Sequence, residues 1–226
     1  MIPAFLNNFF TKHNLRPFEF TWLLYVHVLG LIGFVYFLTH FDKTKSVLPY
    51  FLFFWVAYAM GITGGAHRLW AHKSYSASTP LKIFWMLLNS GANQGSIYHW
   101  SRDHRLHHKF SDTELDPHTI SKGFFFAHVG WLLLKKNPQL IAEGKKIDMS
   151  DLQKDAIVMW QKKYYPYIST FMCFIVPTVV YCWLGNVPLL AAFAFSMFTY
   201  AWVLNITWCV NSICHMFGSR PWNNKI

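Results

Sequence analysis

The stretch that decides the fold is VLPYFLFFWVAYAMGITGGA, residues 47–66, which contains no charged side chain. Twenty helical residues rise about 30 Å, which is the thickness of the hydrocarbon core of a bilayer. Uncharged runs of similar length occupy residues 20–39, 167–184 and 187–210. The sequence therefore predicts an all-α integral membrane protein with four transmembrane helices in two hairpins.

The composition supports a membrane protein. Of the 226 residues, 54% are apolar and 13% are charged, whereas about 25% of a typical soluble chain is charged. Aromatic residues make up 19% of the chain, which argues against disorder. A net charge of +10 on so apolar a chain favours anionic membrane lipids or an anionic substrate over nucleic acid.

The positive charges predict the orientation in the membrane. Residues 67–165 hold 14 of the 20 Lys and Arg, and the tails add others, among them Arg220 and Lys225. Because cytoplasmic segments carry the excess of Lys and Arg, we expect both termini and the 67–165 region in the cytosol. We interpret residues 1–226 as a single domain whose cytosolic helical cap carries most of the histidines.

The histidines gather just outside the predicted spans. The candidates at positions 104, 107 and 108 are spaced i, i+3 and i+4, so they share one side of a helix. His67 and His72 are about 140° apart on a regular α-helix, so we expect the helix to end or bend between them. Imidazole ligands suit iron, zinc and copper. The candidate metal ligands are His67, His72, His104, His107, His108, Asn211 and His215.

The surroundings of these histidines form recognisable motifs. Residues 67–72 have the pattern HxxxxH and residues 104–108 the pattern HxxHH. Five further strings overlap or follow them: GITGGAHRLW at 61–70, WSRDHR at 100–105, DPH at 116–118, GFFFAHVGWL at 123–132 and LNITWCVNSICH at 204–215. In this order, the motifs resemble those of the membrane fatty acyl-CoA desaturases of the stearoyl-CoA Δ9 type.

The resemblance implies an O2-dependent di-iron enzyme of the endoplasmic reticulum membrane. It would introduce a cis double bond, at the Δ9 position, into a saturated fatty acyl-CoA during unsaturated fatty acid biosynthesis. Cytochrome b5, reduced by its NADH-dependent reductase, would supply the electrons. By the same resemblance, one iron takes His67, His72, His104 and His108. The other takes His107 and His215, and Asn211 holds a water.

The resemblance also implies the substrate contacts. Arg102, Asp103, Lys135 and Lys136 would bind the coenzyme A headgroup, whose phosphates suit cationic side chains. The two lysines could instead simply extend to the membrane surface. Trp208 matches a position that contacts substrate. On the second span, Trp55 and Ala59 are one helical turn apart, where the family closes the far end of its acyl channel.

One departure from the family lies at the end of the sequence. The family has a third histidine box, HNxHH, beyond the fourth span, and this sequence reaches Ile226 without one. We therefore expect a C-terminally incomplete desaturase domain. Two alternatives stay open: an incompetent desaturase that acts only as a membrane partner, and another histidine-rich di-iron membrane oxidoreductase such as a lipid hydroxylase.

Overall fold

The computed structural model describes residues 10–218. Arg220 and Lys225, which entered the charge pattern, lie outside this range. Among the described residues, four helical stretches are long and apolar enough to cross a membrane. They are Pro17–Thr39, Phe41–Ala71, Ala156–Trp183 and Leu189–Met216, which confirms the prediction of four spans.

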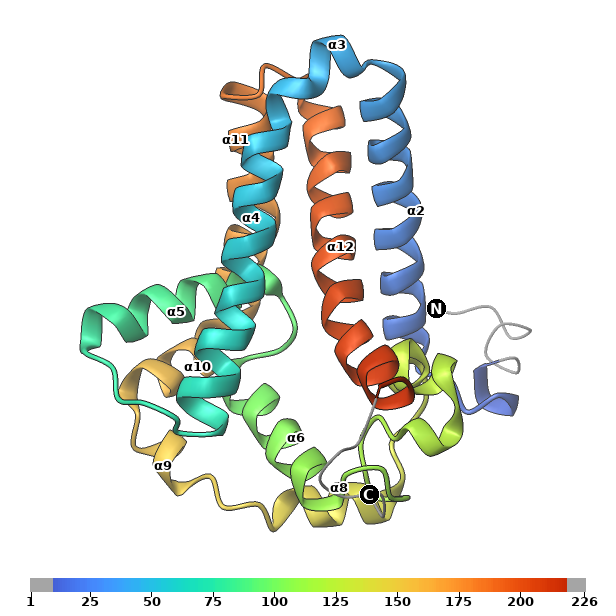
Figure 1. Cartoon of the computed structure of the whole chain (residues 1–226), viewed down its shortest axis with the longest axis vertical. Helices are drawn as coiled ribbons and strands as arrows, with labels where there is room; N and C mark the ends of the chain where they lie inside the picture. Colours follow the sequence, from blue (N-terminus) through green and yellow to red (C-terminus); the bar gives the residue numbers. More distant parts are fainter. Residues whose placement is uncertain (1–9, 219–226) are drawn as a thin grey trace. The chain divides into compact units, whose positions relative to one another are not determined.

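The described residues form helices and loops, and their sole β feature is an isolated bridge between Leu15 and Leu134. In chain order the helices are α2 (Pro17–Thr39), α3 (Phe41–Thr44), η1 (Lys45–Val47), α4 (Leu48–Met60), η2 (Gly61–Ala71), α5 (Thr79–Ala92), α6 (Ile97–Phe110), η3 (Ile120–Lys122), η4 (Phe126–Gly130), α7 (Trp131–Leu133), α8 (Pro138–Lys145), α9 (Ser150–Gln153), α10 (Ala156–Thr170), η5 (Phe171–Ile175), α11 (Val176–Trp183) and α12 (Leu189–Met216). Figure 1 labels the longer of these helices, among them α2, α4, α6 and α12.

These helices divide into two compact units. Unit 1 contains residues 10–25, 106–146 and 205–218, and unit 2 contains residues 26–105 and 147–204. Three helices, α2, α6 and α12, contribute residues to both units. Whether the chain behaves as a single domain stays a prediction.

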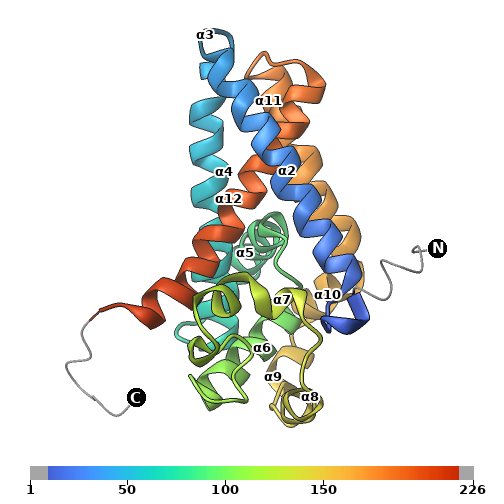
Figure 2. The same ribbon diagram turned by 90° about the vertical axis from the view of Figure 1, so that its right-hand side faces the viewer.

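The spans of unit 2 pack around an aromatic core. The ring of Tyr181 on α11 lies 5.8 Å from that of Phe54 on α4 and 5.2 Å from that of Phe195 on α12. On α2, Gly33 faces α12 so closely that an added Cβ would lie 2.4 Å from the carbonyl carbon of Ala194. Small residues of this kind let transmembrane helices approach each other. Figure 2 shows α3 joining α2 to α4 at one end of this bundle.

The outer faces of these spans are apolar and exposed. Leu31 and Ile32 on α2, and Phe53 and Val56 on α4, each expose more than half of their surface. Contiguous apolar surface is costly in water, but hydrocarbon covers it without cost, while the helices satisfy their own backbone polar groups. Together with the four long apolar helices, this surface defines a multi-pass membrane protein.

A buried polar network fixes the first turn of α6, which carries the second histidine box. The side chain of Gln161 on α10 accepts a hydrogen bond from the backbone N–H of Ile97 at 2.9 Å. Its amide nitrogen donates to Asn89 at 2.8 Å and to Ser90 at 2.9 Å on α5. Ile97 begins α6, so its N–H has no partner within the helix. Gln161 supplies that partner and joins three helices near the histidines.

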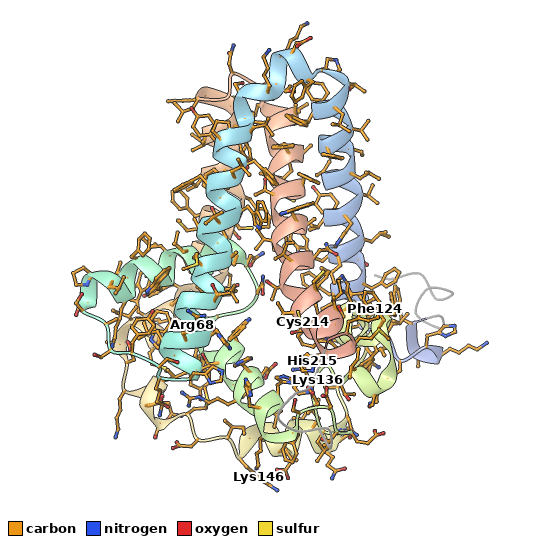
Figure 3. The ribbon with its side chains drawn as sticks, viewed as in Figure 1. Arg68, Phe124, Lys136, Lys146, Cys214 and His215 are labelled. Carbon is orange, nitrogen blue, oxygen red and sulfur yellow. The ribbon has the colours of Figure 1, made fainter. Side chains whose placement is uncertain are left out.

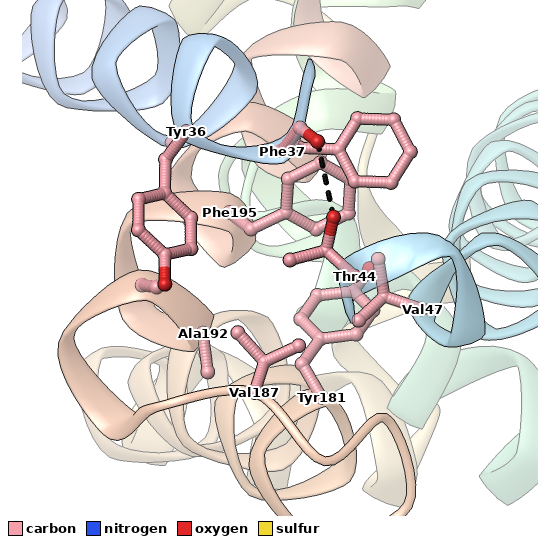
Figure 4. Close-up of a pocket in the computed structure, with 10 residues that line it drawn as sticks. Tyr36, Phe37, Thr44, Val47, Tyr181, Val187, Ala192 and Phe195 are labelled. Atoms are coloured by element: carbon pink, nitrogen blue, oxygen red, sulfur yellow. Dashed lines mark hydrogen bonds between the residues drawn. The ribbon is translucent and has the colours of Figure 1, made fainter. Parts of the chain in front are cut away.

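A small cleft lies at the other end of the second span. Its walls include Tyr36, Phe37, Thr44 and Tyr181, as Figure 4 shows. The hydroxyl of Thr44 donates to the carbonyl of Phe37 at 3.0 Å. The cleft contains no histidine or charged side chain, so the candidate chemistry lies at the opposite end of the helix.

Candidate metal centre

The first histidine box is shaped by an unusual helix. The η2 segment winds as a π-helix, in which each backbone N–H bonds the carbonyl five residues earlier. The N–H of His72 accordingly donates to the carbonyl of His67 at 2.9 Å. Residues at i and i+5 therefore stack one turn apart, and the two rings lie 4.5 Å from each other. The helix ends at Ala71, between the two histidines, as expected, and before that end it widens into the π-helix.

The glycines of η2 allow its neighbour to approach. A Cβ added to Gly61 would lie 2.4 Å from the backbone carbon of Leu88 on α5. The two backbones are therefore in direct contact at this point, which only glycine allows. The helix that carries His67 is thus held against α5, and Figure 1 shows α4 and η2 as one continuous ribbon.

His104 on α6 completes a three-histidine cluster within unit 2. Its ring lies 4.6 Å from that of His67 and 5.0 Å from that of His72. The Nε2 atoms of His72 and His104 are 2.9 Å apart, a separation that two nitrogens show when each lies about 2.1 Å from one ion at right angles. The ring of Trp100 stacks on His104 at 4.8 Å. The arrangement and the all-imidazole donor set fit a transition metal such as iron.

An arginine fork holds this cluster together. Arg105, next to His104, donates to both carboxylate oxygens of Asp151, at 2.9 and 2.7 Å. The same guanidinium donates to the carbonyls of Trp70 and Ala71, at 2.8 and 3.3 Å. The hydrogen bond from Arg105 and the charge of the nearby Lys73 hold the pKa of Asp151 well below its usual range. The end of η2 is thereby fixed to α6 beside both histidine boxes.

A second cluster forms within unit 1. The rings of His107 on α6 and His215 on α12 lie 5.1 Å apart. His215 occupies the last turn of α12, where Figure 3 labels it, and Asn211 lies one turn before it. His118 joins this group, with its ring 4.3 Å from that of His107. Two of the predicted ligands of the second iron are thus close together, with a further histidine beside them.

His118 and two aspartates are site residues that the sequence analysis did not select. His118 is 9% exposed, and its Nδ1 has no hydrogen-bond partner among the described residues. Burial lowers its pKa to about 4, so the ring is neutral at physiological pH. Asp116 and Asp112 bind the Nδ1 atoms of His107 and His215. The DPH string at 116–118 indicates Asp116 and His118 in the sequence, but it does not include Asp112.

Two further predicted site residues of unit 1 are His108 on α6 and Trp208 on α12. His108 follows His104 by one turn of α6, on the same face, and its side chain is exposed. Trp208 on α12 is 3% exposed and lies 5.7 Å from the ring of His128. His128 also bonds Ser212 at 2.9 Å and Asn205 at 3.2 Å. The GFFFAHVGWL segment is thereby attached to α12 next to Trp208.

The predicted headgroup residues are divided between the two units. In unit 2, Arg102 donates to the neighbouring Asp103 through Nε at 2.9 Å and Nη2 at 2.7 Å. In unit 1, Lys135 and Lys136 follow α7, and the N–H of Lys135 donates to the carbonyl of Asn14 at 3.0 Å. Their common role in binding one headgroup stays a prediction.

Comparison with known proteins assigns the class. Residues 45–224 match the family described as Fatty acid desaturase, so this multi-pass membrane protein belongs to that family. It is 46% identical over 207 residues to an Acyl-CoA Delta-9 desaturase of Acheta domesticus, covering 90% of this chain and 56% of the relative. It is 54% identical over 170 residues to an Acyl-CoA desaturase of Cyprinus carpio, covering 74% and 52%. It is 45% identical over 212 residues to Stearoyl-CoA desaturase 2 of Rattus norvegicus, covering 92% and 59%.

These matches confirm the family that the motifs indicated. The chain spans little more than half the length of the curated relatives that it matches.

Proposed function

We propose that this protein serves O2-dependent desaturation of a saturated fatty acyl-CoA, with a cis double bond introduced at the Δ9 position. The observation that carries the proposal is the pair of histidine clusters, above all the 2.9 Å approach of His72 Nε2 to His104 Nε2. The names of the relatives, acyl-CoA and stearoyl-CoA desaturases, supply the substrate class.

The two clusters would hold two metal ions. The first ion takes His67, His72 and His104, with His108 one turn further along α6. The second takes His107 and His215, with a water held by Asn211. Bound iron would supply, with O2, the oxidising power that removal of hydrogen from an unactivated methylene requires and that side chains lack.

The electron balance requires an external donor. Formation of the double bond removes two electrons and two protons from the acyl chain, and reduction of O2 to two waters takes four electrons. The remaining two electrons come from cytochrome b5, which its NADH-dependent reductase reduces. The proposed location is the endoplasmic reticulum membrane, with both termini and the histidines on the cytosolic side, where acyl-CoA and these donors meet.

The chain's own polar residues would bind the substrate headgroup. Nε and Nη2 of Arg102 donate hydrogen bonds to Asp103, which orients the guanidinium. Its Nη1 would then donate to a phosphate of coenzyme A. Lys135 and Lys136 would add two cations at the membrane surface, and Trp208 would contact the acyl thioester region.

The test combines metal analysis with product analysis. The purified protein, with cytochrome b5, its reductase, NADH and stearoyl-CoA, should contain iron and form oleate. The variant His104→Ala should lose both. His99→Ala is the matched control, because His99 lies on the same helix and bonds Ser96 at 3.0 Å instead. A hydroxylated product would favour a lipid hydroxylase, and equal iron in the His104→Ala variant and the wild type would contradict the proposed centre.

A further inference from the structure

The loop that follows α6 provides one aspartate for His107 and another for His215, two of the three histidines of the unit 1 cluster. Asp116 Oδ1 lies 2.9 Å from His107 Nδ1. Asp112 Oδ1 lies 3.0 Å from His215 Nδ1. His107 and His215 come from different helices, yet both bond the same short loop through the same ring nitrogen. Such a match is typical of residues that orient metal ligands.

The two aspartates are also joined to each other. The backbone N–H of Asp112 donates to Asp116 Oδ2 at 2.9 Å, and the N–H of His118 donates to Asp116 Oδ1 at 3.1 Å. The side chain of Asp116 is fully buried, and that of Asp112 is 22% exposed. Asp112 adopts a left-handed backbone conformation with φ of 60°, which aspartate tolerates better than most residues. A change at either aspartate should therefore affect the position of the other.

The carboxylate of Asp116 is better placed to orient a ligand than to bind the metal. It forms a compact group with His107 and His118 that could hold an ion. However, its two oxygens already accept three N–H groups, from His107, His118 and Asp112. A carboxylate is an acceptor only, whereas a neutral imidazole carries its proton on one of its two nitrogens. The proton of His107 therefore lies on Nδ1, and Nε2 keeps its lone pair.

We infer that Asp112 and Asp116 are positioning residues that hold His215 and His107 as Nδ1–H tautomers and present both Nε2 atoms to one metal ion. The inference rests on the proposed function in taking these histidines as metal ligands. Neither aspartate contacts the ion, and both act through the histidine rings.

The experiment uses Asp112→Asn and Asp116→Asn in the whole chain. An asparagine can turn its NH2 group toward Nδ1, which moves the ring proton to Nε2 and blocks the metal-binding nitrogen. The first readout is the tautomer of the ¹⁵N-labelled histidines, measured by NMR without metal. The second is titration with Co²⁺, followed through its absorption spectrum. The control is Asp148→Asn, because Asp148 is an exposed aspartate that accepts from the N–H of Ser150.

We expect Nδ1–H tautomers for His107 and His215 in the wild type and in Asp148→Asn. Each loop variant should shift its own histidine toward the Nε2–H form and bind the second Co²⁺ about 10- to 100-fold more weakly, with the first Co²⁺ unaffected. Asp112→Glu, which keeps the carboxylate, should restore most of the affinity. Because the carboxylate of Asp116 is buried with three donors, its variant could misfold. Asp112→Asn, at the more exposed position, then decides the question.

Unchanged tautomers together with unchanged affinity for the second Co²⁺ in Asp112→Asn would overturn the inference. A wild type that binds no Co²⁺, but whose tautomers respond to the aspartates as expected, would instead contradict the proposed metal function. The two failures are therefore distinguishable.

Discussion

The backbone N–H of His72 bonds the carbonyl of His67, five residues earlier, at 2.9 Å. This single hydrogen bond decides the geometry of the first histidine box, because it closes a π-helical turn and places both rings on one face. In an α-helix the same two side chains would diverge by about 140° and could not approach one ion. The HxxxxH spacing therefore suits a π-helix.

Replacement of Asp151 by Asn should loosen the contact between α6 and α9. Arg105 would lose its charged partner, to which it donates two hydrogen bonds. The side chain of Arg105 is 15% exposed and that of Asp151 is 29% exposed. We expect a loss of about 1 kcal/mol in the free energy of unfolding, since partial exposure weakens such pairs. Chemical denaturation at neutral pH measures this loss, with Asp148→Asn as control. A stability equal to that of the wild type would show that the fork is not needed.

The contribution of Asp151 should also depend on pH. Its pKa is held below its ordinary value of 3.8, so the folded state binds its proton less readily than the unfolded state does. The stabilisation is therefore complete above about pH 4 and disappears as the pH falls through the folded pKa. The stability difference between wild type and Asp151→Asn should be constant from pH 7 to about pH 5 and should shrink below pH 4. A difference that grows in acid would contradict this assignment.

Replacement of Gly33 by Ala should separate α2 from α12. The new Cβ would lie 2.4 Å from the backbone carbon of Ala194, and a backbone cannot rotate away as a side chain can. We expect a loss of about 1–3 kcal/mol, typical of overpacked sites, seen as a lower temperature of thermal unfolding. Gly30→Ala is the matched variant, since its nearest atoms lie at 3.0 Å, and it should lose less. The reverse order would show that the two helices do not meet at Gly33.

The orientation of the protein can be tested at Ser121. This residue is exposed in η3, within the region where most of the Lys and Arg lie. A glycosylation acceptor inserted beside Ser121 should stay unmodified in microsomes, because the cytosolic side has no glycosyltransferase access. The control is an acceptor beside Asp42, in the predicted lumenal turn. Efficient glycosylation at Ser121 would reverse the proposed topology.

Trp55 should influence the length of the acyl chain. Its ring packs against Phe51 at 6.2 Å and against Trp202 at 5.6 Å, on the span that ends at the first histidine box. If the acyl channel runs along this helix, Trp55→Ala opens its far end and shifts the products toward longer chains. Phe53→Ala is the control, because Phe53 is 63% exposed on the outer face of the same helix. An active variant with an unchanged product profile would place the end of the channel elsewhere.

The sequence by itself determined the number of spans, the helical class and the family. Those conclusions depend on local properties: runs of about 20 apolar residues are long enough to cross a bilayer, and the histidine motifs keep their order and spacing. The ends of the spans were less predictable. The second helical stretch reaches Ala71 rather than residue 66, since polar residues such as Arg68 can extend a helix beyond the hydrocarbon.

Only the tertiary structure decided how the histidines meet. The segment η2 packs against α5 at Gly61, whose contact with Leu88 joins residues 27 positions apart along the chain. The hydrogen bond between His215 Nδ1 and Asp112 Oδ1 joins residues 103 positions apart along the chain. Periodicity reports only which face of one helix a residue occupies, so it could not show that one loop would bond Nδ1 of histidines from two helices. Long-range packing sets those partners, and with them the nitrogen that each ring presents.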